Sequence, residues 1–367
     1  MATKDYNPNI TIHPGVTLKE LLENLNMTQT DLAERTGLTP KTINEIIQEK
    51  NPISPETSLK LSAVFGMSPA FWNNLERNYQ ETMARIERDK KLEKELPFLQ
   101  KFHCYKDLTK WKYIPEASDQ KEKVLNLLNF FGVSSLEFVQ KTYQVAFRQS
   151  KQKNLSNECL AAWLRCGEID GIKIETKPFD RDKLMSSIES LRALTNKGAT
   201  EIEKKLQKVC AEFGVAVAFV PYFSNTYVDG ATRWLSTDKA LIQVSLRGAH
   251  IDRFWFTFFH EIGHLLKHGK KDQFVEFEDR SNRMIEVKER EADEFASKTL
   301  IPESEFQQFV SSGKVLSDDG INSFAKKINI SPAIIAGRIA HELSERGSKN
   351  AWKRFSHLRT RLHFVNS

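Results

Sequence analysis

The sequence of 367 residues lacks the usual features of membrane-spanning and secreted proteins. No apolar run approaches the roughly 20 residues that a membrane-spanning helix needs. The first ten residues, MATKDYNPNI, contain no hydrophobic segment of a signal peptide. The four cysteines, Cys104, Cys159, Cys166 and Cys210, form no CxxC pair. We therefore expect a cytoplasmic protein with reduced, structural thiols and no membrane partner.

Acidic residues are missing from the C-terminal end, although the composition as a whole is that of a globular protein, with 40% hydrophobic residues. The last twenty residues contain only basic charges, on Lys349, Lys353, Arg354, Arg359 and Arg361. Both a solvated tail and an arm that contacts nucleic acid agree with this pattern. Apolar residues recur there at helical spacing, namely Trp352, Phe355, Leu358 and Leu362. Part of the tail should therefore dock on the rest of the protein.

Changes of pattern along the chain predict a multidomain protein. Residues 13–80 read as an all-α domain, 81–186 as a helical connector, 187–345 as an α+β domain and 346–367 as the basic tail. Within the α+β domain we expect strands at 214–220, 232–235 and 240–246. Helices should follow at 252–267 and 287–300, with a charged loop between them.

Residues 28–48 carry the signals of two short helices joined by a tight turn. Thr28 suits the N-cap of the first helix, with Asp31 completing an approximate capping box. Gly37 stands where the turn needs a left-handed residue. Thr39 suits the next N-cap and Pro40 the first helical position. This spacing predicts a helix-turn-helix.

In that geometry the second of these helices enters the DNA major groove. The side chains that we expect to reach bases or nearby phosphates are Lys41, Thr42, Asn44, Glu45 and Gln48, while Gln29 lies over the backbone. Residues 13–70 contain five Lys and Arg against seven Asp and Glu, so one domain is net −2. Since phosphate neutralisation supplies much of the affinity, we expect a homodimer on a double-stranded operator.

The segment from His13 to Gln80, with QTDLAERTGLTPKTINEIIQ at its centre, resembles HigA-type antitoxins of the XRE helix-turn-helix class. The resemblance implies binding to the protein's own operator through Gln29, Lys41, Thr42, Asn44 and Glu45. It also implies a toxin partner, but it assigns no particular residue to toxin binding.

The sequence HEIGH places His260 and His264 one helical turn apart, so both imidazoles can bind one Zn²⁺. Glu261 follows the first histidine and would stand beside the open metal position, where it can take a proton from water. The flanking residues are apolar nearly all round, which predicts a buried helix. Histidines and a glutamate on such a helix are costly without a purpose.

A third ligand is expected from the later sequence EREADEFA. At about 100° per residue, Glu289 lies roughly 50° from the centre of the inward face of this helix and Glu291 roughly 110° away. We therefore assign Glu289 as the ligand and keep Glu291 as the alternative. Asp293, one turn further on, can orient a ligand histidine. His268 should miss the metal and make a structural hydrogen bond.

This half of the chain resembles the ImmA/IrrE family of zincin-like metallopeptidases over about residues 187–340. The motifs that carry the resemblance are GATRWL, SLR, FTFFHEIGHLLKH, EREADEFAS, LIP and SPAIIAGRI. The resemblance implies a zincin-like fold, with His260, His264 and Glu289 as metal ligands and Glu261 as general base. Proteins of this family cleave or inactivate transcription repressors, often beside or fused to XRE domains.

A second parallel is internal, because DLAERTGLTPKTI (31–43) and SFAKKINISPAII (323–335) share their spacing. The later copy has Ala333, Ile334 and Ala336 where a DNA-reading helix needs polar groups. We interpret it as the same scaffold used for packing.

Two functions from different classes follow from these patterns. The first is a DNA-binding, antitoxin-like transcriptional regulator with a zinc-dependent endopeptidase domain that acts on a regulatory protein. An extended substrate would then add to a sheet edge near Thr232–Leu235. The alternative is a non-catalytic repressor of antitoxin type, in which the metal domain is a sensor or scaffold. The presence of Glu261 favours the enzyme, because an inert metal scaffold needs ligands only.

Overall fold

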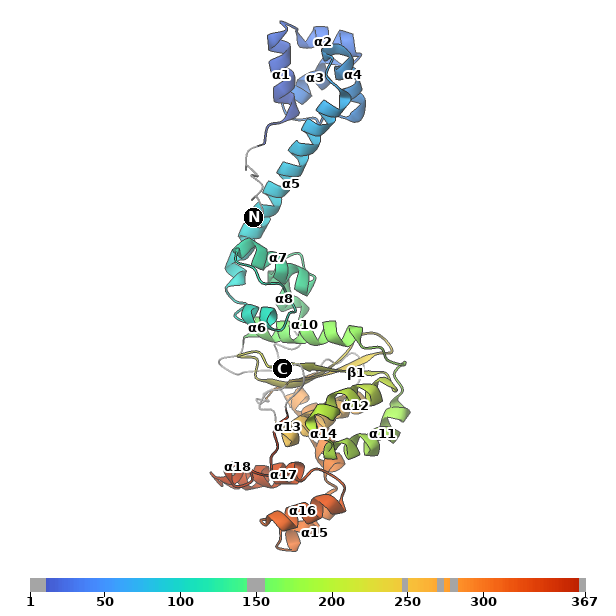
Figure 1. Ribbon diagram of the computed structural model, residues 1–367, viewed down its shortest axis with the longest axis vertical. Helices are drawn as coiled ribbons and strands as arrows, with labels where there is room; N and C mark the ends of the chain where they lie inside the picture. Colours follow the sequence, from blue (N-terminus) through green and yellow to red (C-terminus); the bar gives the residue numbers. More distant parts are fainter. Residues whose placement is uncertain (1–10, 144–155, 246–249, 269–273, 278–282, 363–367) are drawn as a thin grey trace. The chain divides into compact units, whose positions relative to one another are not determined.

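The computed structural model describes residues 11–143, 156–245, 250–268, 274–277 and 283–362. The chain divides into two compact units, Met1–Leu96 and Pro97–Ser367, each with a hydrophobic core of its own (Figure 1). Within the described residues, no helix has both the length and the hydrophobicity needed to cross a membrane.

The N-terminal unit consists of short helices followed by one long helix. They are α1 (Pro14–Asn24), α2 (Gln29–Thr36), α3 (Pro40–Ile47), α4 (Pro55–Phe65) and α5 (Pro69–Leu99), the last of which ends within the second unit. Apolar side chains from all five helices form the core, in which Leu18, Leu32, Ile43, Leu61 and Trp72 are completely buried.

The local signals around the predicted turn are confirmed. The Thr28 hydroxyl accepts a hydrogen bond from the Asp31 N–H at 3.1 Å, and the Asp31 carboxylate accepts one from the Thr28 N–H at 3.0 Å. Gly37 ends α2 with a φ of 67°, in the left-handed region that favours glycine. The Thr39 hydroxyl caps α3 by accepting from the Thr42 N–H at 3.1 Å. The helix-turn-helix prediction is therefore correct.

The C-terminal unit begins with helices only and then adds a sheet. Before the sheet come α6 (Tyr105–Lys110), α7 (Gln120–Phe131), α8 (Glu137–Thr142), α10 (Asn157–Lys173), α11 (Arg181–Ala193), a 3₁₀ turn η1 (Leu194–Asn196) and α12 (Ala199–Ala211). After the third strand come α13 (Ile251–Lys267), α14 (Arg283–Leu300), α15 (Glu303–Ser311), α16 (Asp318–Lys327), α17 (Pro332–Glu345) and α18 (Ala351–Arg354). The predicted α+β class of this part is confirmed.

The sheet has four strands in the order β1–β3–β2–β4, with bounds β1 (Val215–Val220), β2 (Val228–Trp234), β3 (Ala240–Ser245) and β4 (Phe274–Phe277). β1 and β3 are parallel, whereas β2 is antiparallel to both β3 and β4. Figure 1 shows α10 on one face of the sheet and α12 and α13 on the other. Cover on both faces explains why β1 and β3 are buried along nearly their whole length.

Two details of the expected sheet are wrong. The region between the HEIGH helix and the next helix is not only a charged loop, since β4 lies within it. β4 pairs with β2, so that Thr232 stands opposite Phe274. Thr232 therefore lies on an inner strand, between β3 and β4, and a peptide cannot pair beside it. The pairing of β2 with β4 ends at Thr232, so the addition of a peptide at residues 233–235 stays a prediction.

Part of the C-terminal tail docks, as its helical spacing predicted. Phe355 and Leu362 are 1% and 3% exposed. The Arg359 Nε donates to Asp252 Oδ2 at 2.8 Å, and the Ile251 N–H donates to the Thr360 carbonyl at 3.0 Å. These contacts fasten the tail to the first turn of α13.

Candidate functional site

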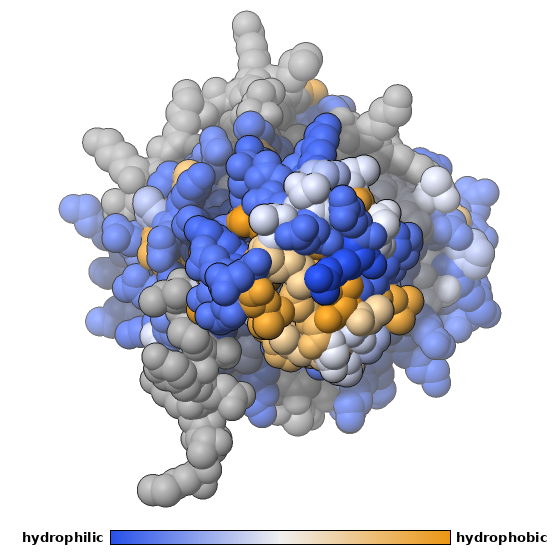
Figure 2. All heavy atoms as spheres, turned by 90° about the horizontal axis from the view of Figure 1, so that it is seen from above, coloured by the Kyte–Doolittle hydropathy of each residue, from blue (hydrophilic) through white to orange (hydrophobic). Residues whose placement is uncertain are grey.

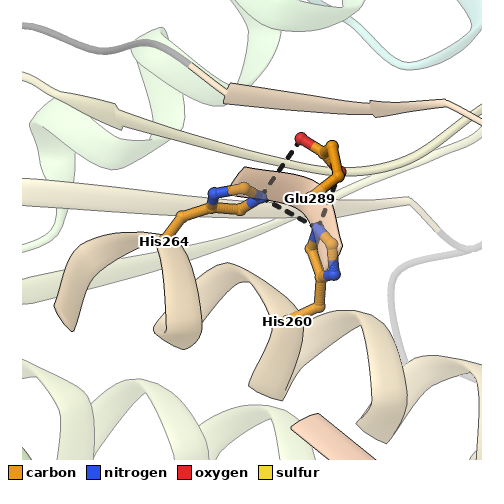
Figure 3. A group of neighbouring side chains, drawn as sticks. All are labelled: His260, His264 and Glu289. Carbon is orange, nitrogen blue, oxygen red and sulfur yellow. Dashed lines mark hydrogen bonds and ion pairs between the residues drawn. The ribbon is translucent and has the colours of Figure 1, made fainter. Parts of the chain in front are cut away.

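The candidate metal centre lies where α13 meets α14. His260 and His264 project from successive turns of α13, and Glu289 reaches them from α14 (Figure 3). The two Nε2 atoms lie 2.9 Å apart, and Glu289 Oε2 is 3.2 Å from the Nε2 of His260. Glu289 Oε1 is 3.4 Å from the Nε2 of His264. All three residues are buried, at 3% exposure or less.

Hydrogen bonds behind the two imidazoles determine where their protons lie. Asp293 Oδ1 is 2.9 Å from the Nδ1 of His260, and a carboxylate only accepts hydrogen bonds. The Nδ1 of His260 therefore carries the proton. Glu291 Oε2 is likewise 3.0 Å from the Nε2 of His268, so that nitrogen is the donor and the Nδ1 of His268 is the acceptor. His268 Nδ1 lies 3.0 Å from the Nδ1 of His264, which therefore donates.

When the rings of His260 and His264 are neutral, each therefore has a lone pair on Nε2 that points toward the space between the two rings and Glu289. Burial lowers the pKa of His264 to about 4, so this ring is neutral at pH 7. Two lone pairs and a carboxylate facing one another at about 3 Å repel unless a cation lies between them. The residues therefore fit a metal ion, and the donors, two imidazole nitrogens and a carboxylate oxygen, match a zinc site.

Glu261 is completely buried, and strand β2 shapes its surroundings. The Thr232 hydroxyl donates to Glu261 Oε2 at 2.5 Å and so holds this carboxylate oxygen in place. A Cβ added at Gly230 would lie 2.5 Å from Glu261 Oε1, so glycine leaves the space that this carboxylate fills. Thr232 and Gly230 were not predicted as site residues, although both belong to the GATRWL motif. They meet Glu261 only through the packing of α13 on β2.

The structure places the other predicted site residues as follows. The Asp293 carboxylate contacts the Nδ1 of His260, one of the three grouped side chains. Glu291 is outside the group of possible ligands and is 47% exposed. His268 is also outside that group and makes hydrogen bonds instead, as we expected.

In the N-terminal unit, α3 buries Ile43 and Ile46 and turns its polar residues outward. The Lys41 side chain is 83% exposed, and its ammonium group lies 3.8 Å from Glu45. The remaining predicted residues of this helix and its C-cap, Thr42, Asn44 and Gln48, are partly or fully exposed on the same outer side, and Gln29 is the first residue of α2. Glu45 also accepts from Asn51 Nδ2 at 2.6 Å, which ties it to the turn after α3.

The surface of this unit is mostly hydrophilic but not uniformly so. In Figure 2, which views the molecule from above, hydrophobic atoms gather in one area surrounded by hydrophilic residues. Among the described residues of this unit, the large hydrophobic ones that are exposed are Ile12, Leu25, Leu59 and Phe71, at 66%, 55%, 61% and 38%.

Two known families match the two units separately. A helix-turn-helix family matches residues 18–72, and the IrrE N-terminal-like domain matches residues 210–340. The uncharacterized HTH-type transcriptional regulator YddM of Escherichia coli is 35% identical over 75 residues, which is 20% of this chain and 78% of that protein. Virulence-associated protein I of Dichelobacter nodosus is 36% identical over 80 residues, 22% of this chain and 72% of that protein.

Among solved structures, an addiction module antidote protein of the HigA family from Coxiella burnetii is similar at 36% identity. The match covers 23% of this chain and 92% of that one, with a TM-score of 0.22.

Proposed function

The chain belongs to the XRE-type helix-turn-helix regulators and carries an IrrE-like domain, and on this premise we propose that it is a DNA-binding, antitoxin-like regulator with a zinc-dependent endopeptidase unit. The substrate would be a regulatory protein. The observation that carries the proposal is the buried group of two imidazoles and a carboxylate, with Glu261 next to His260 on the same helix. An inert metal scaffold does not need that fourth, acidic side chain.

His260, His264 and Glu289 would hold the zinc ion, and Asp293 would fix the orientation of His260. Bound zinc supplies Lewis acidity, which polarises a peptide carbonyl and acidifies water.

Glu261 would act as the general base. Its carboxylate takes a proton from the water that attacks the peptide carbonyl and later returns a proton to the leaving amine. The hydroxyl of Thr232 holds one carboxylate oxygen of Glu261, so the side chain is kept in one orientation for both transfers. Burial excludes bulk water, which strengthens the electrostatic interactions of the carboxylate.

The N-terminal unit would read an operator through the outer side of α3. Asn44 can pair with adenine and Lys41 with guanine, while Gln29, Thr42, Glu45 and Gln48 contact bases or nearby phosphates. Because one unit is net −2, two copies are needed for adequate affinity. A homodimer would present two α3 helices to half-sites about one helical turn apart. The exposed hydrophobic side chains, such as Leu59 and Phe71, give a second copy an apolar surface to cover.

The decisive experiment compares Glu261→Gln with His260→Ala in the full chain. Glutamine keeps the size of the side chain but cannot accept the proton, so cleavage should fall by about 10²–10⁴-fold. Zinc content and operator binding should stay at the level of the native chain. Candidate substrates are the proteins encoded next to its gene, which would be incubated with each variant and examined by mass spectrometry.

The same pair of variants separates the enzyme from a scaffold. The promoter that the protein controls would be followed in cells that carry each variant. If its regulation is normal with Glu261→Gln but defective with His260→Ala, the metal has a structural or sensing role. The peptidase proposal would then be abandoned.

A further inference from the structure

The side chains behind the two ligand histidines differ. His260 is held directly by Asp293, whereas His264 contacts a second imidazole, that of His268, which in turn contacts Glu291. His268 therefore stands between a ligand and a carboxylate.

The backbone of α13 makes this contact possible. His268 is the C-cap of the helix, with φ −115° and ψ 161°, and its N–H still donates to the His264 carbonyl at 3.1 Å. Residues at i and i+4 of a continuous helix drift round its axis. Since His268 has already left the helix, its ring turns back and its Nδ1 lies 3.0 Å from the Nδ1 of His264. The side chain is only 4% exposed.

Only one arrangement of protons satisfies the three groups when both rings are neutral. The Glu291 carboxylate accepts, so His268 Nε2 donates; His268 Nδ1 then accepts, so His264 Nδ1 donates. The Nε2 of His264 is left as a lone pair that points to Glu289 and His260. A chain of two hydrogen bonds thus selects the tautomer that binds metal and fixes the plane of the ring.

We propose that His268 and Glu291 are positioning residues for the metal ligand His264. The inference rests on the metal centre of the proposed function but not on peptidase activity. Glu291 is 47% exposed, so its hydrogen bond is screened by solvent. His268 is buried and makes the bond to the ligand itself. Loss of His268 should therefore weaken metal binding more than loss of Glu291.

The experiment measures the zinc affinity of the full chain by competition with a chelator. His268→Phe removes both hydrogen bonds and should lower zinc affinity by about 10–100-fold. His268→Asn keeps an acceptor at the position of Nδ1 and should recover most of that loss. Glu291→Ala should lower zinc affinity by on the order of 3–10-fold, less than the loss of a residue that contacts a ligand directly. In the His268→Asn background, Glu291→Ala should not lower zinc affinity any further, because Glu291 no longer has its partner.

The matched control is Glu294→Ala on the same helix, because Glu294 forms an exposed ion pair with Lys298. Its zinc affinity should equal that of the native chain. Native affinity in His268→Phe, or equal losses in His268→Phe and His268→Asn, would overturn the positioning role while leaving the metal centre in place. Failure of the native chain to bind zinc would overturn the metal centre and this inference together.

Discussion

Two pairs of helices in the chain, α2–α3 and α16–α17, share their local construction. An N-capping hydroxyl followed by proline begins the second helix of each, with Thr39 and Pro40 in one and Ser331 and Pro332 in the other. The residue two positions before the cap has a positive φ in both, 67° at Gly37 and 54° at Asn329. The cap and the left-handed residue are thus common to both pairs of helices.

The two second helices differ on the side that α3 turns outward. Lys41 and Asn44 of α3 correspond in spacing to Ala333 and Ala336 of α17, which are 1% and 0% exposed. α17 packs against α13, the helix that carries His260 and His264, whereas α3 keeps its polar side outward. Similar pairs of helices therefore support the helix that carries His260 and His264 in one unit and leave a polar side exposed in the other. What the second helix does depends on its side chains and not on its backbone.

The largest effect should come from giving α17 a side chain of α3. Ala336→Asn puts a larger, polar group into a filled core, which combines overpacking with an unsatisfied amide and should cost about 2–5 kcal/mol of unfolding free energy. The reverse change, Asn44→Ala, should alter stability by no more than about 0.5 kcal/mol, because this helical position is outside the core. Calorimetry of each variant measures the change in unfolding free energy. Similar costs at both positions would refute the contrast between the two helices.

A smaller effect is expected on DNA affinity when a polar side chain of α3 is removed. Asn44→Ala should weaken binding to the promoter of its own gene by about 1–3 kcal/mol and leave binding to unrelated DNA unchanged, because base contacts and not phosphate contacts are lost. Gel-shift titrations with both DNAs measure this. Asn74→Ala, an exposed asparagine of α5, is the matched control and should bind both DNAs as the native chain does. A parallel loss on both DNAs would show that Asn44 does not read bases.

Features that depend on neighbours in the sequence could be predicted. The caps at Thr28 and Thr39 and the left-handed Gly37 follow from local hydrogen bonding and backbone sterics. The burial of Glu289 followed from its angle on a regular helix, because α14 continues through that position. The position of Glu289 on its helix was therefore enough to predict that its carboxylate points inward, toward the two histidines.

Features that depend on contacts between distant residues, or on irregular backbone, could not be predicted from the sequence. β4 is four residues long and lies in a charged stretch, so alternation had too few residues to reveal it. The bond between Thr232 and Glu261 joins residues 29 positions apart and arises only when α13 packs on β2. The contact of His268 with His264 could not be placed from helical angles, since the helix ends at His268.

The smallest effect should come from the left-handed residue that both segments need. Gly37→Ala forces a Cβ into the left-handed region and should cost about 1 kcal/mol. Asn329→Ala should cost about the same, because alanine tolerates that φ less well than asparagine does. Asn329→Gly should stay within about 0.5 kcal/mol of the native chain, since relief of backbone strain offsets the greater freedom of the unfolded chain. Asn329 Oδ1 also accepts from Asn196 Nδ2 at 3.0 Å, in an exposed position where the bond contributes little. Thermal unfolding of the three variants tests this order. If Asn329→Gly proved as costly as Asn329→Ala, the amide contact would matter more than the backbone, and the two turns would differ in what stabilises them.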